Sequence, residues 1–429
     1  MSQTLKAVRG TRDLLPPETA LWNRIEQTAR AVFARYNFGE IRTPIFEDTA
    51  LFARGVGEET DIVSKEMYTW EDRARAQSEK AQSLTLRPEN TAGVVRAYIE
   101  HKLGESGQLQ KLYYIGPQFR RERPQKGRYR QFFQIGAEVI GPPSAGSESP
   151  LRDAEVLEML ATLLDELGIR GWTLHLNSVG SAADRARYNE ALRAALAPVV
   201  SQMCGDCQRR AETNPLRVLD CKVPEDQPII DALPRVADHL DEESKRHFAA
   251  VTAALDAAGV PYTRNHRLVR GLDYYTRTTF EFTHGGLGAQ NALLGGGRYD
   301  GLSEMLGGPR APGIGFAMGE DRLALTLQAQ SDQSSAAQQK ADAFVAPLGE
   351  SLNAAALNLA RELRHQGLWI ELGEGGFRLK KSFDAAEKTA RQIVILGEDE
   401  LKSGILTVKN FSTGVQTKVP RAELATFLA

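Results

Sequence analysis

Hydrophobic and polar positions near the N-terminus predict a helix followed by a strand. Apolar side chains at spacings of three and four would share one face of an amphipathic helix ending near residues 37–39: Leu21, Ile25, Ala29, Val32 and Tyr36. The next segment, residues 40–47, alternates between apolar and polar side chains and contains Pro44. Because proline cannot donate to a sheet ladder, we expect this strand at a sheet edge, a bulge or a subunit contact.

The middle of the chain alternates between helical and strand patterns. It predicts a strand from Leu84, a helix over 91–101, strands over 112–116 and 131–139, a helix over 152–167 and a strand over 173–177. Two of these strands flank a strongly polar loop, which indicates an antiparallel hairpin with a long connection.

Residues 180–258 differ in character, since they are rich in alanine and charge and mostly helical in pattern. We interpret them as an inserted helical subdomain with a cysteine-rich turn over 204–221. Strands resume at 276–282, a glycine-rich turn leads to Tyr299, and residues 313–319 run into a helix that holds Arg322.

Residues 328–340 are almost wholly Gln, Ser, Ala and Asp, so they predict a linker with nothing to bury. Beyond it, predicted strands and helices alternate: strands over 343–346, 368–372 and 392–396, and helices over 352–363 and 382–390. This order predicts a small α/β domain over 341–429 with a largely parallel sheet.

Composition limits the class of protein. With 429 residues the chain is long enough for more than one core, and a net charge of −2 leaves only local patches to hold a nucleic acid. No segment has the length of apolar residues that a membrane span needs, and the N-terminus has no signal-peptide core. Three cysteines make no disulfide framework. We therefore expect a cytoplasmic protein with reduced thiols and no membrane partner.

The predicted hairpin loop carries six basic residues among residues 120–130 and one acid, Glu122. A charged run is usually a solvated face, but this one is flanked by strands and interleaved with Tyr129, Phe132 and Phe133. Gln134 and Glu138 would follow on the same strand face as Phe132. Guanidinium groups bind polyphosphates and an aromatic face can stack on a base, so the loop is a candidate nucleotide site.

Two further clusters are weaker by themselves. In residues 87–93, Thr91 is either the N-cap of the following helix or a partner of Glu89 in binding an ammonium group. Residues 270–277 precede the glycine triplet 295–297, which indicates a plain turn or a close approach of backbone to ligand. The spacing of the glycines in this triplet excludes a Walker loop and a Rossmann fingerprint.

Cys204, Cys207 and Cys221 raise the possibility of zinc. A structural zinc site needs four ligands, and His239 or His247 would have to supply the fourth. Buried thiols in a helical turn are the preferred interpretation, so no metal site is predicted.

Together these segments resemble the class II aminoacyl-tRNA synthetases, and specifically the histidyl-tRNA synthetase family, over essentially the whole chain. The helix and Pro44 segment look like the first class motif, residues 116–138 like the second and residues 313–322 like the third. Residues 268–275 and 294–300 look like the two stretches peculiar to the histidine family.

The resemblance implies an α+β protein. It would have a class II antiparallel-sheet catalytic domain over 1–327, a helical insertion over about 180–258 and a C-terminal α/β anticodon-binding domain. Such an enzyme activates L-histidine with ATP and transfers it to the 3′ end of tRNA-His, releasing AMP and pyrophosphate. Mg²⁺ would accompany ATP, no prosthetic group is expected, and the first motif implies a homodimer.

The resemblance also implies residue roles. Arg120 and Arg270 would be catalytic, contacting the α-phosphate from opposite sides. ATP would be bound by Arg120, Glu122, Phe132 and Arg322. Histidine would be bound by Glu89, Asn90, Thr91, Gln134, Glu138, Tyr274 and Tyr275, with Glu138 and Tyr275 at the ring nitrogens. The tRNA acceptor end would meet Arg123, Gln125 and Arg130, and anticodon phosphates would meet Lys380 and Lys381.

The sequence departs from the family pattern at Asn90, where glycine is expected, and at Phe133, where histidine is common. Three alternative assignments predict different sequence features. A non-catalytic regulatory paralogue of ATP phosphoribosyltransferase typically loses the C-terminal domain and the Arg270 motif, and both are present here. A synthetase-like sensor domain would be part of a larger kinase and would need a kinase segment in the chain. A class II synthetase for proline, threonine or glycine should lack residues 270–275 and carry a hydrophobic or zinc-bearing pocket.

Overall fold

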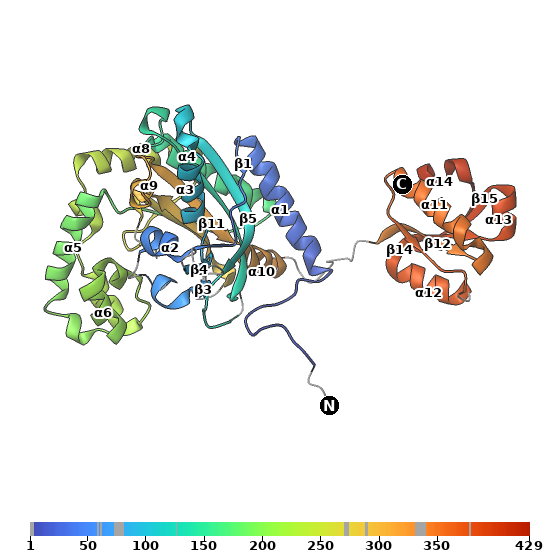
Figure 1. The fold of residues 1–429 in the computed structure, drawn as a ribbon, viewed down its shortest axis with the longest axis horizontal. Coiled ribbons are helices and arrows are strands. Elements are labelled where there is room, and N and C mark those ends of the chain that lie inside the picture. Colours follow the sequence, from blue (N-terminus) through green and yellow to red (C-terminus); the bar gives the residue numbers. More distant parts are fainter. Residues whose placement is uncertain are drawn as a thin grey trace. The chain divides into compact units, whose positions relative to one another are not determined.

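The chain folds into two compact units, Met1–Gln333 and Ser334–Ala429 (Figure 1). The computed structural model describes residues 4–57, 60, 62–72, 81–125, 127–269, 274–287, 291–330, 340–376 and 379–429. Most of the predicted linker, from 331 to 339, therefore lies outside the described residues, and helix α10 (Glu320–Gln330) extends into its start. Among the described residues, no helix has the length and apolar character needed to cross a membrane.

The first unit is built on an eight-stranded sheet in the order β1-β5-β6-β11-β10-β9-β7-β8. The strands are β1 (Gly39–Glu40), β5 (Gln110–Phe119), β6 (Gln131–Ile140), β7 (Trp172–Ser178), β8 (Thr263–Arg264), β9 (Thr276–His284), β10 (Ala292–Arg298) and β11 (Gly313–Gly319). Neighbouring strands are antiparallel except at the two edges of the sheet. There β1 pairs in parallel with β5, and β8 pairs in parallel with β7. The predicted hairpin is confirmed, because β5 and β6 pair from Gln110–Ile140 to Phe119–Gln131.

The segment around Pro44 is two short strands rather than the single strand that we expected. β1 ends at Glu40, and β2 (Phe46–Asp48) joins a separate three-stranded sheet with β4 (Gln82–Leu86) and β3 (Tyr68–Asp72). Both strands lie at sheet edges, as the proline predicted. The interruption allows one segment to serve two sheets.

The glycine triplet lies inside β10, between β9 and β11, and not in a turn. A Cβ atom on Gly296 would lie 2.1 Å from the carbonyl oxygen of Gly315 and 2.8 Å from Cζ of Phe280. Because a side chain has no room there, glycine allows the central strands and their aromatic neighbours to pack closely.

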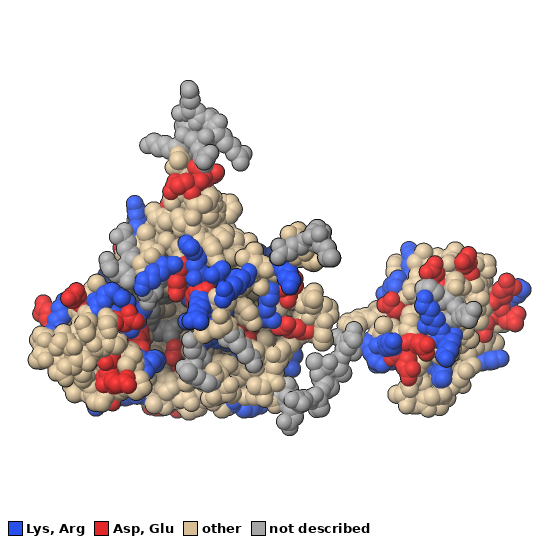
Figure 2. Space-filling model, turned by 90° about the horizontal axis from the view of Figure 1, so that it is seen from below, with Lys and Arg blue, Asp and Glu red and all other residues tan. Residues whose placement is uncertain are grey.

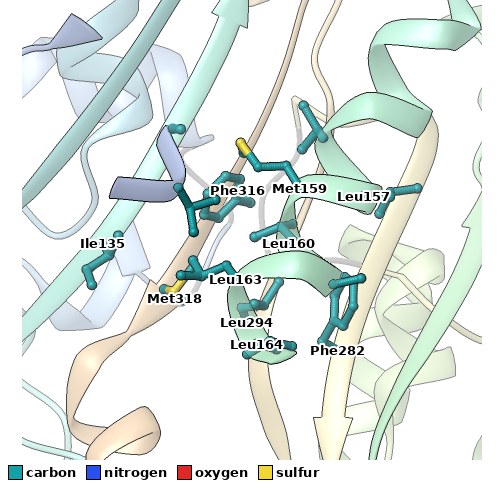
Figure 3. Packing of buried hydrophobic residues seen from close by; sticks show 14 of the residues in the cluster. Ile135, Leu157, Met159, Leu160, Leu163, Leu164, Phe282, Leu294, Phe316 and Met318 are labelled. Atoms are coloured by element: carbon teal, nitrogen blue, oxygen red, sulfur yellow. The ribbon is translucent and has the colours of Figure 1, made fainter. Parts of the chain in front are cut away.

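Helices cover one face of this sheet: α1 (Glu18–Arg35), α4 (Pro150–Leu167), α8 (Glu242–Ala258) and α10. Figure 3 shows Leu160, Leu163 and Leu164 of α4 packed among side chains of the central strands. The opposite face carries α3 (Thr91–Glu100) and α9 (Leu302–Met305) through a second cluster that includes Tyr98 and Tyr299. A short helix, α2 (Thr49–Val56), packs against α3.

The helical insertion has a core of its own, formed mainly by residues between Tyr188 and Leu240. Its helices are α5 (Ala182–Leu196), α6 (Gly205–Thr213) and α7 (Gln227–Asp231). Helix α8 falls within the range expected for the insertion, 180–258, but its Val251 and Leu255 are buried in the main core beside α4. The part of the insertion with its own core is therefore shorter than the range 180–258 that the helical sequence pattern predicted.

The second unit contains a five-stranded sheet in the order β13-β12-β14-β15-β16. The strands are β12 (Ala341–Pro347), β13 (Ile370–Leu372), β14 (Ala390–Leu396), β15 (Ile405–Asn410) and β16 (Gln416–Pro420), and the helices are α11 (Asn353–His365), α12 (Leu379–Thr389), α13 (Glu398–Ser403) and α14 (Leu424–Leu428). The first three strands are parallel as predicted, but β15 and β16 add an antiparallel hairpin that we did not predict.

A buried ion pair joins α4 to the sheet of the first unit. Asp153 and Arg298 have no exposed surface, and Nη2 of Arg298 lies 2.6 Å from Oδ1 of Asp153. Thr278 Oγ1 donates to Asp153 Oδ2 at 2.6 Å, and His247 Nε2 lies 2.8 Å from the same oxygen. Burial acts to raise the pKa of Asp153, but Arg298 and His247 lower it to about 2. The ionised carboxylate therefore connects α4, α8, β9 and β10.

We expect Arg298→Met to lower the free energy of unfolding by about 3–5 kcal/mol, because it leaves the Asp153 charge buried without its cation. Urea denaturation followed by circular dichroism measures the change. Arg310→Met is the matched control, since the Arg310–Glu148 pair is also short, at 2.5 Å, but the Arg310 side chain is 65% exposed. Arg310→Met should lower the free energy of unfolding by less than about 1 kcal/mol. Similar losses in both variants would contradict the assigned role of burial.

Candidate active site

A cavity of about 210 Å³ lies among α3, β6, β10, β11 and the β5–β6 loop. The structure brings together on its wall nine of the residues predicted from the sequence: Glu89, Thr91, Arg120, Glu122, Phe132, Gln134, Tyr274, Tyr275 and Arg322. Figure 2 shows Lys and Arg side chains gathered around a hollow on one face of the first unit. The wall thus combines carboxylates, aromatic rings and guanidinium groups.

Glu89 holds the first turn of α3. Its carboxylate accepts hydrogen bonds from the backbone N–H of Thr91 at 2.8 Å and of Ala92 at 3.0 Å. The alternative that Thr91 is the N-cap is therefore wrong, and the Thr91 hydroxyl donates instead to Glu138 Oε1 at 2.7 Å. Burial raises the pKa of Glu89, although the two backbone hydrogen bonds and Arg120 oppose the shift.

Glu138 lies one layer behind the wall and has no exposed surface. Its second oxygen accepts a hydrogen bond from the Tyr299 hydroxyl at 2.7 Å. A Cβ atom on Gly315 would lie 1.6 Å from that oxygen, so glycine at this position makes room for the carboxylate. Burial raises the pKa of Glu138 to about 8, against hydrogen bonds from Tyr299 and Thr91 that lower it. Glu138 is not on the cavity wall, so its contact with a ligand ring stays a prediction.

Three residues of the wall offer acceptor oxygens. Besides the Glu89 carboxylate and the Thr91 hydroxyl oxygen, the wall includes Gln134, whose Oε1 atom is buried. This oxygen has no hydrogen-bond partner within the described part of the chain. Because a buried acceptor without a partner is costly, a ligand donor is the expected partner. Three acceptor groups, one of them a carboxylate, match the three N–H donors of an ammonium group.

Guanidinium groups also line the cavity. Arg120 Nε donates to the carbonyl of Pro88 at 2.9 Å, and its guanidinium carbon lies 5.2 Å from the ring centroid of Phe132. Arg322 Nη1 donates to the carbonyl of Ala292 at 2.7 Å. Burial lowers the pKa of Arg322, and the positive charges of Arg128 and Arg120 add to the effect. This concentration of positive charge suits a polyphosphate.

The sequence did not assign roles to several residues of the wall. Arg128 lies in the basic run, and its Nε is 2.7 Å from Glu122 Oε2. Asp321 pairs with Arg12 at 2.9 Å, and the Arg12 guanidinium carbon lies 4.8 Å from the ring centroid of Tyr129. The basic run was a signal for Arg128, but no local pattern predicts that Arg12, about 300 positions away, orients Asp321.

Adjacent tyrosines line the cavity together. Tyr274 and Tyr275 are both buried, and their ring centroids are 4.8 Å apart. Both contribute to the wall. Tyr274 also makes an edge contact with Tyr299 at 5.8 Å, which joins it to the layer containing Glu138.

Other predicted residues have different placements. Asn90 Oδ1 accepts a hydrogen bond from Thr43 Oγ1 at 2.6 Å, and Asn90 is not on the cavity wall, so the structure does not support its expected contact with histidine. Arg123 and Gln125 are exposed at the hairpin tip. Arg130 holds the N-terminal segment, because its backbone N–H donates to Gly10 and its side chain to the carbonyl of Arg9. Arg270 and residues 271–273 lie outside the described residues.

Lys380 and Lys381 of the second unit are exposed in the first turn of α12. Both side chains are therefore accessible, and their contact with anticodon phosphates stays a prediction.

The chain is similar to known proteins over its whole length. A family model described as histidyl-tRNA synthetase matches residues 10–323, and one described as anticodon binding domain matches residues 342–429. The histidine–tRNA ligase of Koribacter versatilis (strain Ellin345) is 73% identical over 425 residues, covering 99% of this chain and 96% of the relative. That of Solibacter usitatus (strain Ellin6076) is 57% identical, covering 98% of each chain. The crystal structure of apo S. aureus histidyl-tRNA synthetase superposes with a TM-score of 0.80 at 38% identity, covering 99% of this chain and 100% of that one.

We expect Glu138→Gln to stabilise the protein near pH 8. Unfolded Glu138 loses its proton near pH 4.5, whereas the folded protein retains it up to about 8. Wild-type stability therefore falls across this window, and the variant, which has no proton to lose, should gain up to a few kcal/mol at its upper end. Urea denaturation at pH 5 and pH 8 measures the gain in the free energy of unfolding. Glu304→Gln is the control, because Glu304 is exposed. An equal gain at both pH values would exclude ionisation as the cause.

Proposed function

This chain belongs to the histidyl-tRNA synthetase family, and we propose that the cavity described above is where it activates L-histidine with ATP. The enzyme is a histidine–tRNA ligase. In the first step, the histidine carboxylate attacks the α-phosphorus of ATP and pyrophosphate leaves. In the second, the terminal ribose hydroxyl of tRNA-His attacks the carbonyl carbon of histidyl-adenylate, and AMP leaves.

Three acceptor groups that line the same cavity carry the proposal for amino-acid binding. Glu89 offers a buried carboxylate and Thr91 a hydroxyl oxygen. Gln134 offers a buried oxygen that has no partner among the described residues. The proton of the Thr91 hydroxyl is directed to Glu138, so the oxygen lone pairs remain available to the α-ammonium group of histidine. Tyr274 and Tyr275 would then flank the imidazole, with Glu138 acting from behind the wall.

The guanidinium groups support the assignment of the nucleotide subsite. Arg120, stacked on Phe132 and fixed by Pro88, would contact the α-phosphate, and Phe132 would offer its ring to adenine. Arg322 would hold the γ-phosphate end, and Glu122 would orient the nucleotide. Catalysis of this step is mainly positioning and electrostatic stabilisation of the phosphoryl oxygens. Mg²⁺ would arrive with ATP as its counter-ion.

Arg270 would approach the α-phosphate from the side opposite Arg120. The family resemblance of residues 268–275 supports this role, and Tyr274, in the same motif, lies on the cavity wall. In the second step no side chain is assigned as a base, and a non-bridging phosphate oxygen would accept the ribose proton.

We propose that tRNA contacts both units. Exposed Arg123 and Gln125 at the hairpin tip would meet the acceptor end, joined by Arg130. The second unit, matched by the anticodon-binding model, would bind the anticodon stem with Lys380 and Lys381 among its contacts. Translation of the cell's messages would place the enzyme in the cytoplasm.

A homodimer is also proposed, through the Pro44 region. Three large apolar residues are exposed beside it, with Ile45 at 44%, Phe46 at 54% and Trp70 at 40%. The rings of Phe46 and Trp70 are 6.1 Å apart, so they form one contiguous apolar surface on the three-stranded sheet. Burial of such a surface against a second copy would remove it from water.

The alternative, a regulatory paralogue without catalysis, is not favoured. The full-length relatives reported above are ligases at 73% and 57% identity, and the second unit matches the anticodon-binding model throughout. The cavity also retains both the acceptor oxygens and the guanidinium groups that activation requires.

ATP–pyrophosphate exchange with each of the twenty amino acids tests the function directly. We expect labelled pyrophosphate to enter ATP with histidine alone, because the acceptor set binds the ammonium group and the polar layer behind the tyrosines suits an imidazole. Exchange with another amino acid would overturn the specificity. Absence of exchange from folded protein would favour the regulatory alternative.

Gln134→Leu should raise the KM for histidine by about 10- to 100-fold, because it removes one hydrogen bond to a charged group. The KM for ATP should stay within about twofold. Gln131→Leu is the matched control, since Gln131 lies on the opposite face of β6 and is not on the cavity wall. An equal rise in both Michaelis constants would show that Gln134 shapes the whole cavity and does not bind the amino acid.

A further inference from the structure

Three thiols and a carboxylate meet in the helical insertion, and none of them lines the active-site cavity. The ligand atoms of Cys204, Cys207, Cys221 and Asp226 all lie within 4.8 Å of one another. Cys204 is half-buried and the other three are buried. We propose that these four residues form a structural zinc site, with three thiolates and one carboxylate as ligands.

The distances suit tetrahedral coordination. Zinc–sulfur bonds of about 2.3 Å at tetrahedral angles place two sulfurs roughly 3.8 Å apart. The sulfurs of Cys204 and Cys221 are 3.9 Å apart, and Cys221 Sγ lies 3.2 Å from Asp226 Oδ2. A disulfide would instead bring two sulfurs to about 2 Å and leave one thiol and the carboxylate outside the bond. The arrangement therefore favours one ion held by all four groups.

Local structure directs the four groups to one point. Cys204 precedes α6 and Cys207 lies in its first turn, where the N-terminal end of the helix favours thiolates. Cys221 follows a 3₁₀ helix over Pro215–Asp220, and Asp226 ends another over Pro224–Asp226.

Backbone hydrogen bonds around the cluster resemble those that orient metal ligands. The N–H of Val223 donates to Cys221 Sγ at 3.4 Å, and the N–H of Cys204 donates to Asp226 Oδ1 at 3.1 Å. Outer contacts of this kind fix ligand orientation in metal sites.

Asp226 provides a separate reason for a cation. It is only 1% exposed, and within the described residues it makes no ion pair. Burial of an isolated carboxylate is unfavourable unless a cation or a metal balances it. A zinc ion with three thiolates and one carboxylate has the same net charge as the common four-cysteine site.

Asp226 also replaces the histidines that the sequence suggested as the fourth ligand. His247 is engaged with Asp153 in the main core. The ring of His239 lies 5.5 Å from that of Tyr188, and His239 is not part of the cluster. A carboxylate oxygen is an accepted zinc ligand, so the set of four is complete without a histidine.

The insertion has a structural need for such a link. Between residues 199 and 240 it contains a nine-residue helix, a five-residue helix and four 3₁₀ helices. Helices this short are not stable alone. An ion that connects residue 204 to residues 221 and 226 would supply the constraint that small cores lack.

Metal analysis of the full-length protein, purified without chelators, tests the proposal. We expect about one zinc per chain by plasma mass spectrometry, and a thiolate-to-cobalt charge-transfer band after exchange with Co²⁺. Cys207→Ser should lose both signals. Asp226→Asn, nearly the same shape, should weaken Zn²⁺ binding by more than about 100-fold, since even outer-shell changes commonly cost 10- to 100-fold. Asp206→Asn is the matched control, because exposed Asp206 lies between the first two cysteines but outside the cluster.

Circular dichroism and pyrophosphate exchange of each variant verify that it is folded. Three outcomes would overturn the proposal. The first is no zinc in the purified protein together with no Zn²⁺ or Co²⁺ binding on titration. The second is a full zinc equivalent retained by folded Cys207→Ser. The third is a single titratable thiol in denatured, unreduced protein treated with chelator, which would indicate a disulfide in place of the metal.

Discussion

The buried carboxylate of Glu138 is the constraint around which the active site is arranged. It lies in a central strand without exposure to water, so each of its oxygens needs a partner from another segment. Thr91 supplies one from the start of α3, and Tyr299 supplies the other from the end of β10. The space for the carboxylate exists only because Gly315 on the neighbouring strand has no side chain. The unfavourable burial of the Glu138 carboxylate therefore constrains the positions of α3, Tyr299 and Gly315.

The site in front of this carboxylate combines two kinds of polar group. Acceptor oxygens from the start of α3 and from β6 suit an ammonium group, whereas guanidinium groups from the β5–β6 loop and α10 suit phosphates. Arg120 is placed between the two, because it is anchored at Pro88, directly before Glu89. A histidine bound by its ammonium group would therefore present its carboxylate toward the phosphates, which is the orientation that adenylate formation requires.

Rigid elements support this arrangement away from the cavity. The Asp153–Arg298 pair fixes the end of β10 against α4, and Tyr299 follows Arg298 directly in the chain. The insertion has a small core with short helices, and its four-residue cluster of thiols and carboxylate lies where those helices meet. In each region, polar groups from separate segments meet within a larger apolar core.

The sequence by itself determined the elements with strong periodicity, the β5–β6 hairpin, the α/β character of the second unit and nine of the residues on the cavity wall. The elements follow from local spacing. The wall residues follow from the chemistry that phosphates and an ammonium group require, together with the resemblance to the synthetase family. Only the tertiary structure decided that Asn90 turns to Thr43, that Glu138 lies behind the wall, that the glycine triplet is a central strand and that Asp226 joins the thiols. Each of these depends on which distant segment packs against the residue, and local spacing does not contain that information.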